Sequence, residues 1–159
     1  MKIIKEIINV LTTLIIVIGG IFILLFAIGF TPYVVLSGSM EPEIKTGSIC
    51  FINRHTSYDD IKENDIIAFR LKGGTLVTHR VIDITDEGII TKGDNNEEQD
   101  DVITTKNNFV GKNSFWIPKV GYLVVLLQTT KGKIIFITYI VLLVVAGLLF
   151  GEDKKKEEK

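Results

Sequence analysis

Thiol and imidazole groups are scarce in this chain of 159 residues. It has a single cysteine, Cys50, and two histidines, His55 and His79. One thiol can form neither an internal disulfide nor a thiolate metal cluster. A single well-placed imidazole is too few for a histidine-rich zinc site, so we expect no cofactor and no metal. The net charge of −1 lacks the basic excess of nucleic-acid binders, and we expect no nucleic-acid partner.

Charge is missing from two long segments near the ends of the chain. No charged residue lies between Glu6 and Glu41, or between Lys133 and Glu152. About 20 apolar helical residues cross a bilayer core, so we expect transmembrane helices over residues 7–30 and 133–151. The second apolar run is short enough for the core helix of a soluble protein, but it is apolar on all sides.

The lysines that flank these segments predict the orientation of the chain. Lys2 and Lys5 precede the first span, and Lys154–Lys156 follow the second. By the positive-inside rule, residues 1–6 and the charged tail 152–159 are cytoplasmic, and residues 31–132 form an extracytoplasmic domain. This predicts a two-pass protein of the cell membrane. The small residues Ala27 and Gly29 resemble a signal-peptide cleavage site, but the apolar run before them is too long, which favours a retained anchor.

The middle of the chain alternates short apolar runs with turn residues. We expect strands over 33–36, 48–52, 65–69, 75–84 and 89–91, with glycine turns at 72–74 and 86–88. Closely spaced short strands predict a mostly β fold, with an antiparallel β catalytic domain flanked by the two membrane helices. Residues 120–130 are apolar with little alternation, and either an interfacial segment or a helix entering the second span fits them.

Three short segments of this domain hold the side chains that a serine hydrolase needs. Ser-Gly-Ser-Met-Glu-Pro (37–42) offers hydroxyls and exposed backbone amides, Thr-His-Arg-Val (78–81) offers an imidazole, and residues 93–101 offer carboxylates. Histidine accepts a proton near neutral pH, and a carboxylate orients the imidazole. Each segment alone is common in structural loops and strands. His55 lies in a polar loop, where we expect it to be solvated.

The acidic segment has two further interpretations. Asp94, Asn96 and Glu98 alternate like the first ligands of a calcium loop. However, Gln99 stands where that loop needs glycine, and Thr105 stands where it needs a bidentate glutamate. A solvated acidic turn is the plainest alternative.

The ordered set of these motifs resembles type I signal peptidase. It is most similar to the histidine-base branch found in the endoplasmic reticulum, in archaea and in sporulating Gram-positive bacteria. Residues 46–49 and 63–69 are similar to the family's strand motifs, so that the resemblance covers roughly residues 10–120. It implies a membrane-bound serine endopeptidase that removes signal peptides from secreted preproteins after small-x-small sequences.

The resemblance also implies a role for each matched residue. Ser39, directly before methionine, would be the nucleophile, and His79 takes the position that a lysine base holds in the common bacterial branch. The two family acids fall on Asp94 and Asp100. Asp100 is the better match to the acid that contacts the histidine, although Asp101 stands beside it. The oxyanion would be held by the Ser39 amide and by Ser37.

Three other functions stay open at the level of sequence. The chain could be a dedicated maturation peptidase with one or few substrates, a non-catalytic membrane scaffold, or a calcium-regulated variant. The expected partners are signal-peptide-bearing preproteins and the lipid bilayer. The sequence does not decide whether accessory membrane subunits are needed.

Overall fold

The computed structural model describes residues 2–151, and the predicted charged tail 152–159 lies outside the described residues. The chain divides into two compact units, one of residues 25–125 and one of residues 1–24 with 126–159. In chain order, the elements are α1 (Lys2–Ala27), β1 (Phe30–Val34), β2 (Ile49–Asn53), the short 3-10 helix η1 (Tyr58–Asp60), β3 (Ile66–Arg70), β4 (Leu76–Thr85), β5 (Gly88–Lys92), β6 (Phe109–Ile117), α2 (Val120–Gln128) and α3 (Thr130–Gly151).

The first helix has the length and composition of a membrane span. Its segment Glu6–Ala27 has a mean hydropathy of 2.8, and none of its most apolar window is buried within the protein. An exposed helix that is apolar on all sides suits lipid rather than water. The helix ends three residues before the predicted boundary because Gly29 takes a φ of +88°, and its amide bonds back to the Phe26 carbonyl at 3.1 Å.

The C-terminal apolar segment forms two helices rather than one. α2 and α3 are separated by a break at Thr129 and are bent by 97°. Within the described residues, neither helix alone has the length and hydropathy of a membrane span, but the two taken together do. α3 matches the helix expected over 133–151, and its crossing of a membrane stays a prediction.

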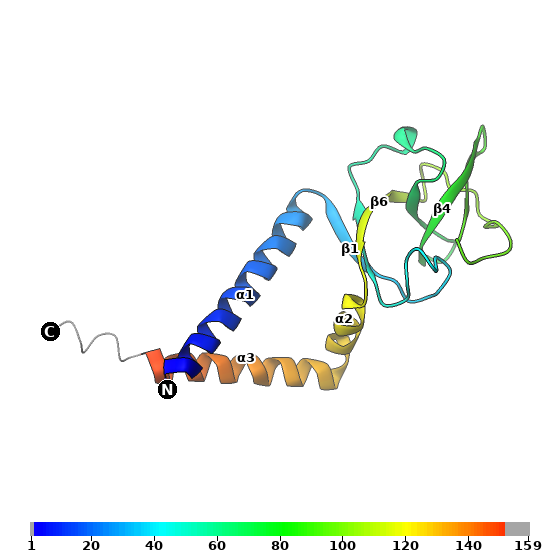
Figure 1. Cartoon of the computed structure of the whole chain (residues 1–159). Coiled ribbons are helices and arrows are strands. Elements are labelled where there is room, and N and C mark those ends of the chain that lie inside the picture. Colours follow the sequence, from blue (N-terminus) through cyan, green and yellow to red (C-terminus); the bar gives the residue numbers. More distant parts are fainter. Residues whose placement is uncertain (1, 152–159) are drawn as a thin grey trace. The chain divides into compact units, whose positions relative to one another are not determined.

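The middle of the chain is one antiparallel sheet of six strands, in the order β1-β2-β6-β3-β4-β5 (Figure 1). Among the described residues more lie in helices than in strands, so the description "mostly β" fits this domain and not the whole chain. The reason is that the long apolar ends are helical.

Four of the predicted strands match β2 to β5 closely. β1 begins earlier than expected, at Phe30, because it pairs with the whole of β2 from Asn53 back to Ile49. No strand is predicted from the sequence over β6, which lies between β2 and β3 and joins the two halves of the sheet. Its centre carries Lys112 and Asn113, which interrupt the apolar pattern.

Apolar side chains cover both faces of the sheet, which explains the continuous apolar runs of β2 and β3. Neighbouring residues of β3 point to opposite faces. Ile66 and Ala68 pack in a cluster with Met40 and Ile44, whereas Ile67 and Phe69 pack in a second cluster with other strands and η1. The loop that carries the first predicted motif is therefore anchored in the core.

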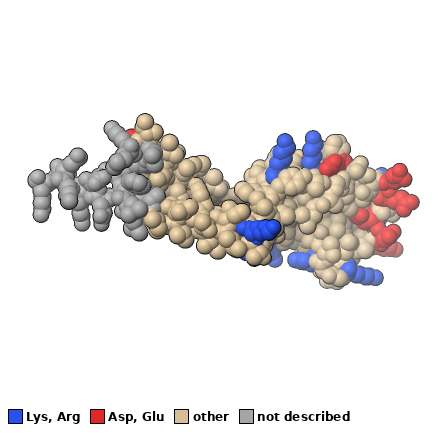
Figure 2. Space-filling view, turned by 90° about the horizontal axis from the view of Figure 1, so that it is seen from below, with Lys and Arg blue, Asp and Glu red and all other residues tan. Residues whose placement is uncertain are grey.

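Charged side chains are unevenly distributed along the chain. Figure 2 shows the described helical part almost without blue or red, whereas lysines and acidic residues gather on the β domain. This is the distribution expected of helices in lipid and a domain in water.

The single thiol gives a test of the core. Cys50 is fully buried on β2, and burial raises the pKa of its thiol to about 12. Because the thiolate is the reactive form, we expect no alkylation of Cys50 at pH 8 in the folded protein and complete alkylation in denaturant. A Lys72→Cys variant, with a thiol in an exposed turn, should react at once under the same native conditions. Native labelling of Cys50 at a similar rate would contradict this packing.

Candidate active site

Ser39 lies in the loop between β1 and β2. The next residue, Met40, is 2% exposed, and Ile44, four residues further, is fully buried. The Ile44 amide donates to the Met40 carbonyl at 2.8 Å, which closes a turn. Glu41 accepts two hydrogen bonds from Thr46, at 3.2 Å from its amide and 3.1 Å from its hydroxyl. The hydroxyl of Ser39 thus belongs to a loop that is fixed directly after the serine by packing and by hydrogen bonds.

His79 lies on β4 and is 6% exposed. Its Nε2 is 3.0 Å from the Ser39 hydroxyl, and its Nδ1 is 2.9 and 2.8 Å from the two carboxylate oxygens of Asp100. A carboxylate only accepts hydrogen bonds, so the proton of a neutral imidazole belongs on Nδ1. Nε2 is then free to accept the hydroxyl proton of Ser39. The structure brings these three sequence-predicted residues into one hydrogen-bonded chain.

The Asp100 carboxylate is held by a residue that sequence reasoning missed. Thr91, fully buried on β5, donates its hydroxyl to Asp100 Oδ2 at 2.5 Å. Its backbone carbonyl accepts from the Asp100 amide at 2.8 Å. No local motif marks this threonine, because its position opposite Asp100 depends on the return of the loop after β5.

Asp94 does not contact His79. Both its oxygens accept hydrogen bonds from Arg80, at 2.8 and 2.7 Å, and Arg80 also donates to the Asn64 carbonyl at 3.0 Å. The hydrogen bond to Asp94 is the main cause that raises the pKa of the Arg80 guanidinium. Asp101 is exposed. Of the three candidate acids, Asp100 is the one that meets the imidazole.

The turn that carries Asp94 also contacts the backbone of Ser39. The Asn95 amide donates to the Ser39 carbonyl at 2.8 Å. At Gly93, a Cβ atom would lie 2.6 Å from that same carbonyl oxygen, so only glycine allows this close approach. The ion pair between Arg80 and Asp94 therefore ties the serine loop to the strand that carries His79.

Ser37 lies beside the candidate nucleophile. Its hydroxyl is 3.3 Å from the Ser39 hydroxyl and is exposed to solvent. Among the described residues, the Ser39 amide donates to no other group. The Ser39 amide and the Ser37 hydroxyl are two neighbouring donors that could stabilise a developing oxyanion.

A cavity of about 630 Å³ opens next to Ser39 and His79. Residues 33–37 form one wall, residues 75–79 form the other, and Met40 and Ile44 contribute to the lining. β1 is an edge strand of the sheet. β4 pairs with β5 only from Arg80 onward, so residues 76–79 of β4 have no partner on the side of β5. The walls of the cavity thus include residues 33–34 of β1 and residues 76–79 of β4, two strand segments with a free edge among the described residues.

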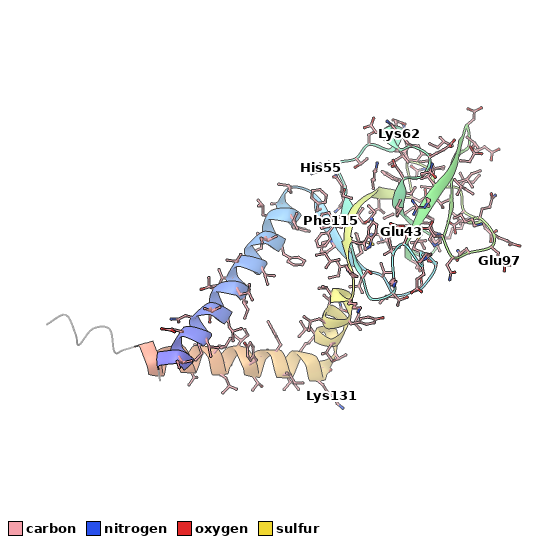
Figure 3. All side chains as sticks on the ribbon, viewed as in Figure 1. Glu43, His55, Lys62, Glu97, Phe115 and Lys131 are labelled. Atoms are coloured by element: carbon pink, nitrogen blue, oxygen red, sulfur yellow. The ribbon has the colours of Figure 1, made fainter. Side chains whose placement is uncertain are left out.

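His55, the other histidine, takes no part in this arrangement. It packs against Gly29 at the start of the domain. In Figure 3 it lies far from Glu97, which belongs to the acidic loop that leads to Asp100. The predicted solvated position agrees with its exposure.

Comparisons with known proteins identify a family. The model of the family "Signal peptidase, peptidase S26" matches residues 4–116. Signal peptidase I W of Bacillus subtilis is 42% identical over 84 residues, which is 50% of this chain and 44% of that protein. The signal peptidase complex catalytic subunit SEC11 of Komagataella phaffii is 33% identical over 116 residues, 62% of this chain and 67% of that subunit. SEC11 of Clavispora lusitaniae is 35% identical over 107 residues, 59% of this chain and 63% of that subunit. The chain thus spans less than half of the Bacillus relative and about two thirds of the yeast relatives.

The Arg80–Asp94 pair gives a test of how the site is held. Its side chains are 27% and 17% exposed and its geometry is bidentate. In a double-mutant cycle of Arg80→Ala and Asp94→Ala, we expect a coupling of about 1–3 kcal/mol in the free energy of unfolding.

Lys106 and Asp59 provide a matched control. This pair has the same separation of 2.7 Å but is 65% and 66% exposed, so the same cycle should give a coupling close to zero. Equal couplings for the two pairs would show that the Arg80–Asp94 bond does not fix the turn.

Proposed function

Because the chain belongs to the signal peptidase family, peptidase S26, we propose that it is a membrane-bound serine endopeptidase that removes N-terminal signal peptides from secreted preproteins. The observation that carries this proposal is the hydrogen-bonded chain from Ser39 through His79 to Asp100. A hydroxyl, an imidazole and a carboxylate in that order form the constellation of serine acyl transfer.

Ser39 is the nucleophile of the proposed reaction. Its oxygen attacks the peptide carbonyl while His79 Nε2 accepts the hydroxyl proton across the 3.0 Å contact. Asp100 keeps the proton of the imidazole on Nδ1 and stabilises the imidazolium that forms. His79 then returns the proton to the leaving amine, and the signal peptide stays bound to Ser39 as an ester. A water molecule, deprotonated by the same imidazole, hydrolyses the ester.

The oxyanion of each tetrahedral intermediate is held at the serine loop. The Ser39 amide donates to the oxyanion directly. Ser37 supplies a second donor, its hydroxyl, which lies 3.3 Å from the Ser39 hydroxyl. Such donors act on the charge that develops in the transition state, and so they raise kcat more than they lower KM. Asp94 supports the loop through Arg80 rather than the proton transfer.

The substrate binds in the cavity beside Ser39 as an extended chain. The free strand edges at residues 33–34 and 76–79 can both pair with a peptide backbone, which leaves alternate side chains of the peptide facing the walls. Most side chains of the lining are apolar, which favours apolar residues one and three positions before the cut. Family membership suggests that these residues are also small, as in a small-x-small sequence.

We expect the membrane to hold the enzyme and its substrate at the same distance from the bilayer surface. α1 is the proposed anchor, with residues 1–6 in the cytoplasm, residues 31–132 outside, and α3 as a second crossing that returns the tail to the cytoplasm. A signal peptide whose own helix ends at the interface presents its cleavage site there, which raises the effective concentration of the scissile bond. The yeast relatives are named as subunits of a complex, so accessory membrane subunits are part of the proposal.

Substitution of the two reacting side chains tests the function. We expect Ser39→Ala and His79→Ala each to abolish cleavage of a preprotein in reconstituted membranes, because one removes the nucleophile and the other its base. Membrane insertion of the variants should be unchanged. The measurement is the fraction of preprotein processed with time.

Two residues of the same types serve as controls. Ser114→Ala and His55→Ala alter exposed side chains outside the site and should leave processing intact. Processing by the Ser39→Ala protein at the rate of the parent protein would refute the assignment.

A second substitution tests the oxyanion donor. We expect Ser37→Ala to lower kcat roughly 100-fold with little change in KM, because the donor acts mainly in the transition state. The Ser114→Ala protein again provides the reference. An unchanged kcat would assign the oxyanion to the Ser39 amide alone.

A further inference from the structure

The hydrogen-bonded chain of the site does not end at Asp100 but continues to Thr91. We infer that Thr91 is a positioning residue of the catalytic acid, which it orients toward His79. The inference rests on the proposed function, since it concerns the reaction assigned to Ser39 and His79. The Thr91 hydroxyl bonds to Asp100, and Thr91 does not line the cavity, so we expect it to act through Asp100.

Thr91 holds Asp100 at two points. Its hydroxyl donates to Oδ2 at 2.5 Å, and its backbone carbonyl accepts from the Asp100 amide at 2.8 Å. The first contact fixes the carboxylate, and the second fixes the backbone that carries it. Asp100 itself lies in the irregular segment after β5, outside any strand. Its position is thus set by Thr91 rather than by the sheet ladder.

Thr91 is itself fixed relative to His79. It is fully buried on β5 and pairs with Val81 of β4, two residues after the histidine. β4 and β5 are adjacent antiparallel strands. The imidazole and the threonine hydroxyl are therefore held by one pair of hydrogen-bonded strands, and Asp100 bridges them.

The geometry of the carboxylate explains why one hydroxyl matters. Both Asp100 oxygens lie within hydrogen-bond distance of His79 Nδ1, at 2.9 and 2.8 Å. The imidazole alone would allow the carboxylate to rotate between these two contacts. A donor on Oδ2 selects one orientation, and a hydrogen bond to an ionised group is a strong one. With the carboxylate fixed, Nδ1 keeps its proton and Nε2 stays directed at Ser39.

A merely structural role makes a different prediction. If Thr91 only filled space between strands, then valine, which has nearly the same shape, would serve as well. If its hydroxyl orients Asp100, then valine fails and serine, which keeps the hydroxyl, succeeds. The two variants therefore separate shape from hydrogen bonding.

The test is preprotein cleavage by the full chain in reconstituted membranes, with a substrate that has alanine one and three residues before the cut. We expect Thr91→Val to lower kcat roughly tenfold or more while KM changes less than twofold, because the residue does not line the cavity. Thr91→Ser should keep kcat within about threefold of the parent. Should the valine variant fold poorly, Thr91→Ala and Thr91→Ser, which differ only by the hydroxyl, repeat the comparison.

Thr104 offers a matched control. It is also fully buried, and it pairs with Ile89 of the same strand β5. In contrast to Thr91, its hydroxyl has no hydrogen-bond partner within the described part of the chain. Thr104→Val makes the same chemical change without removing a bond, so cleavage should stay at the parent rate.

The outcomes separate this inference from the proposed function. A normal kcat for Thr91→Val, an equal loss in Thr91→Ser, or a loss confined to KM would overturn the role of Thr91 while Ser39→Ala remains inactive. Cleavage by Ser39→Ala at the parent rate would instead overturn the proposed function.

Discussion

The imidazole of His79 is held at both of its nitrogens, and the rest of the site is built around that double contact. Ser39 meets Nε2 and Asp100 meets Nδ1, although the three residues belong to a loop, a strand and a second loop. Since a carboxylate can only accept, it sets the tautomer, and the tautomer sets which nitrogen serves the serine. A shift of either loop would break this order, so the stability of both loops is a requirement of the proposed chemistry.

The turn after β5 meets that requirement for the loop of Ser39. It begins at Gly93, where the absence of a side chain lets the backbone approach the Ser39 carbonyl. The Asn95 amide of this turn donates to that carbonyl. The Asp94 carboxylate accepts two hydrogen bonds from Arg80, the neighbour of His79. Residues that look like a solvated acidic turn in the sequence thus connect the loop of Ser39 to the strand of His79. Asp94, one of the two acids that the resemblance implies, contacts Arg80 and not His79.

The sequence predicted those features that a local pattern of residues marks. The strands β2 to β5 were visible because apolar runs between turn residues mark buried strands, and the ordered motifs pointed to Ser39 and His79. β6 was missed because its place in the centre of the sheet comes from pairing with distant strands, not from its own pattern. Thr91 was missed for a similar reason: its partner lies on a returning loop, and no spacing rule specifies that contact. The choice among the neighbouring acids likewise needed the coordinates.

The link between α1 and Ser39 is short and largely ordered. α1 ends at Ala27, β1 begins at Phe30, and every residue of β1 has a partner in β2. Five paired residues at about 3.3 Å each extend for about 17 Å, so β1 acts as a spacer of fixed length. Within residues 25–125, the path of the chain from the end of α1 to the serine loop is therefore set by strand pairing rather than by a flexible linker. An insertion in β1 would have to break its pairing with β2 to lengthen that path.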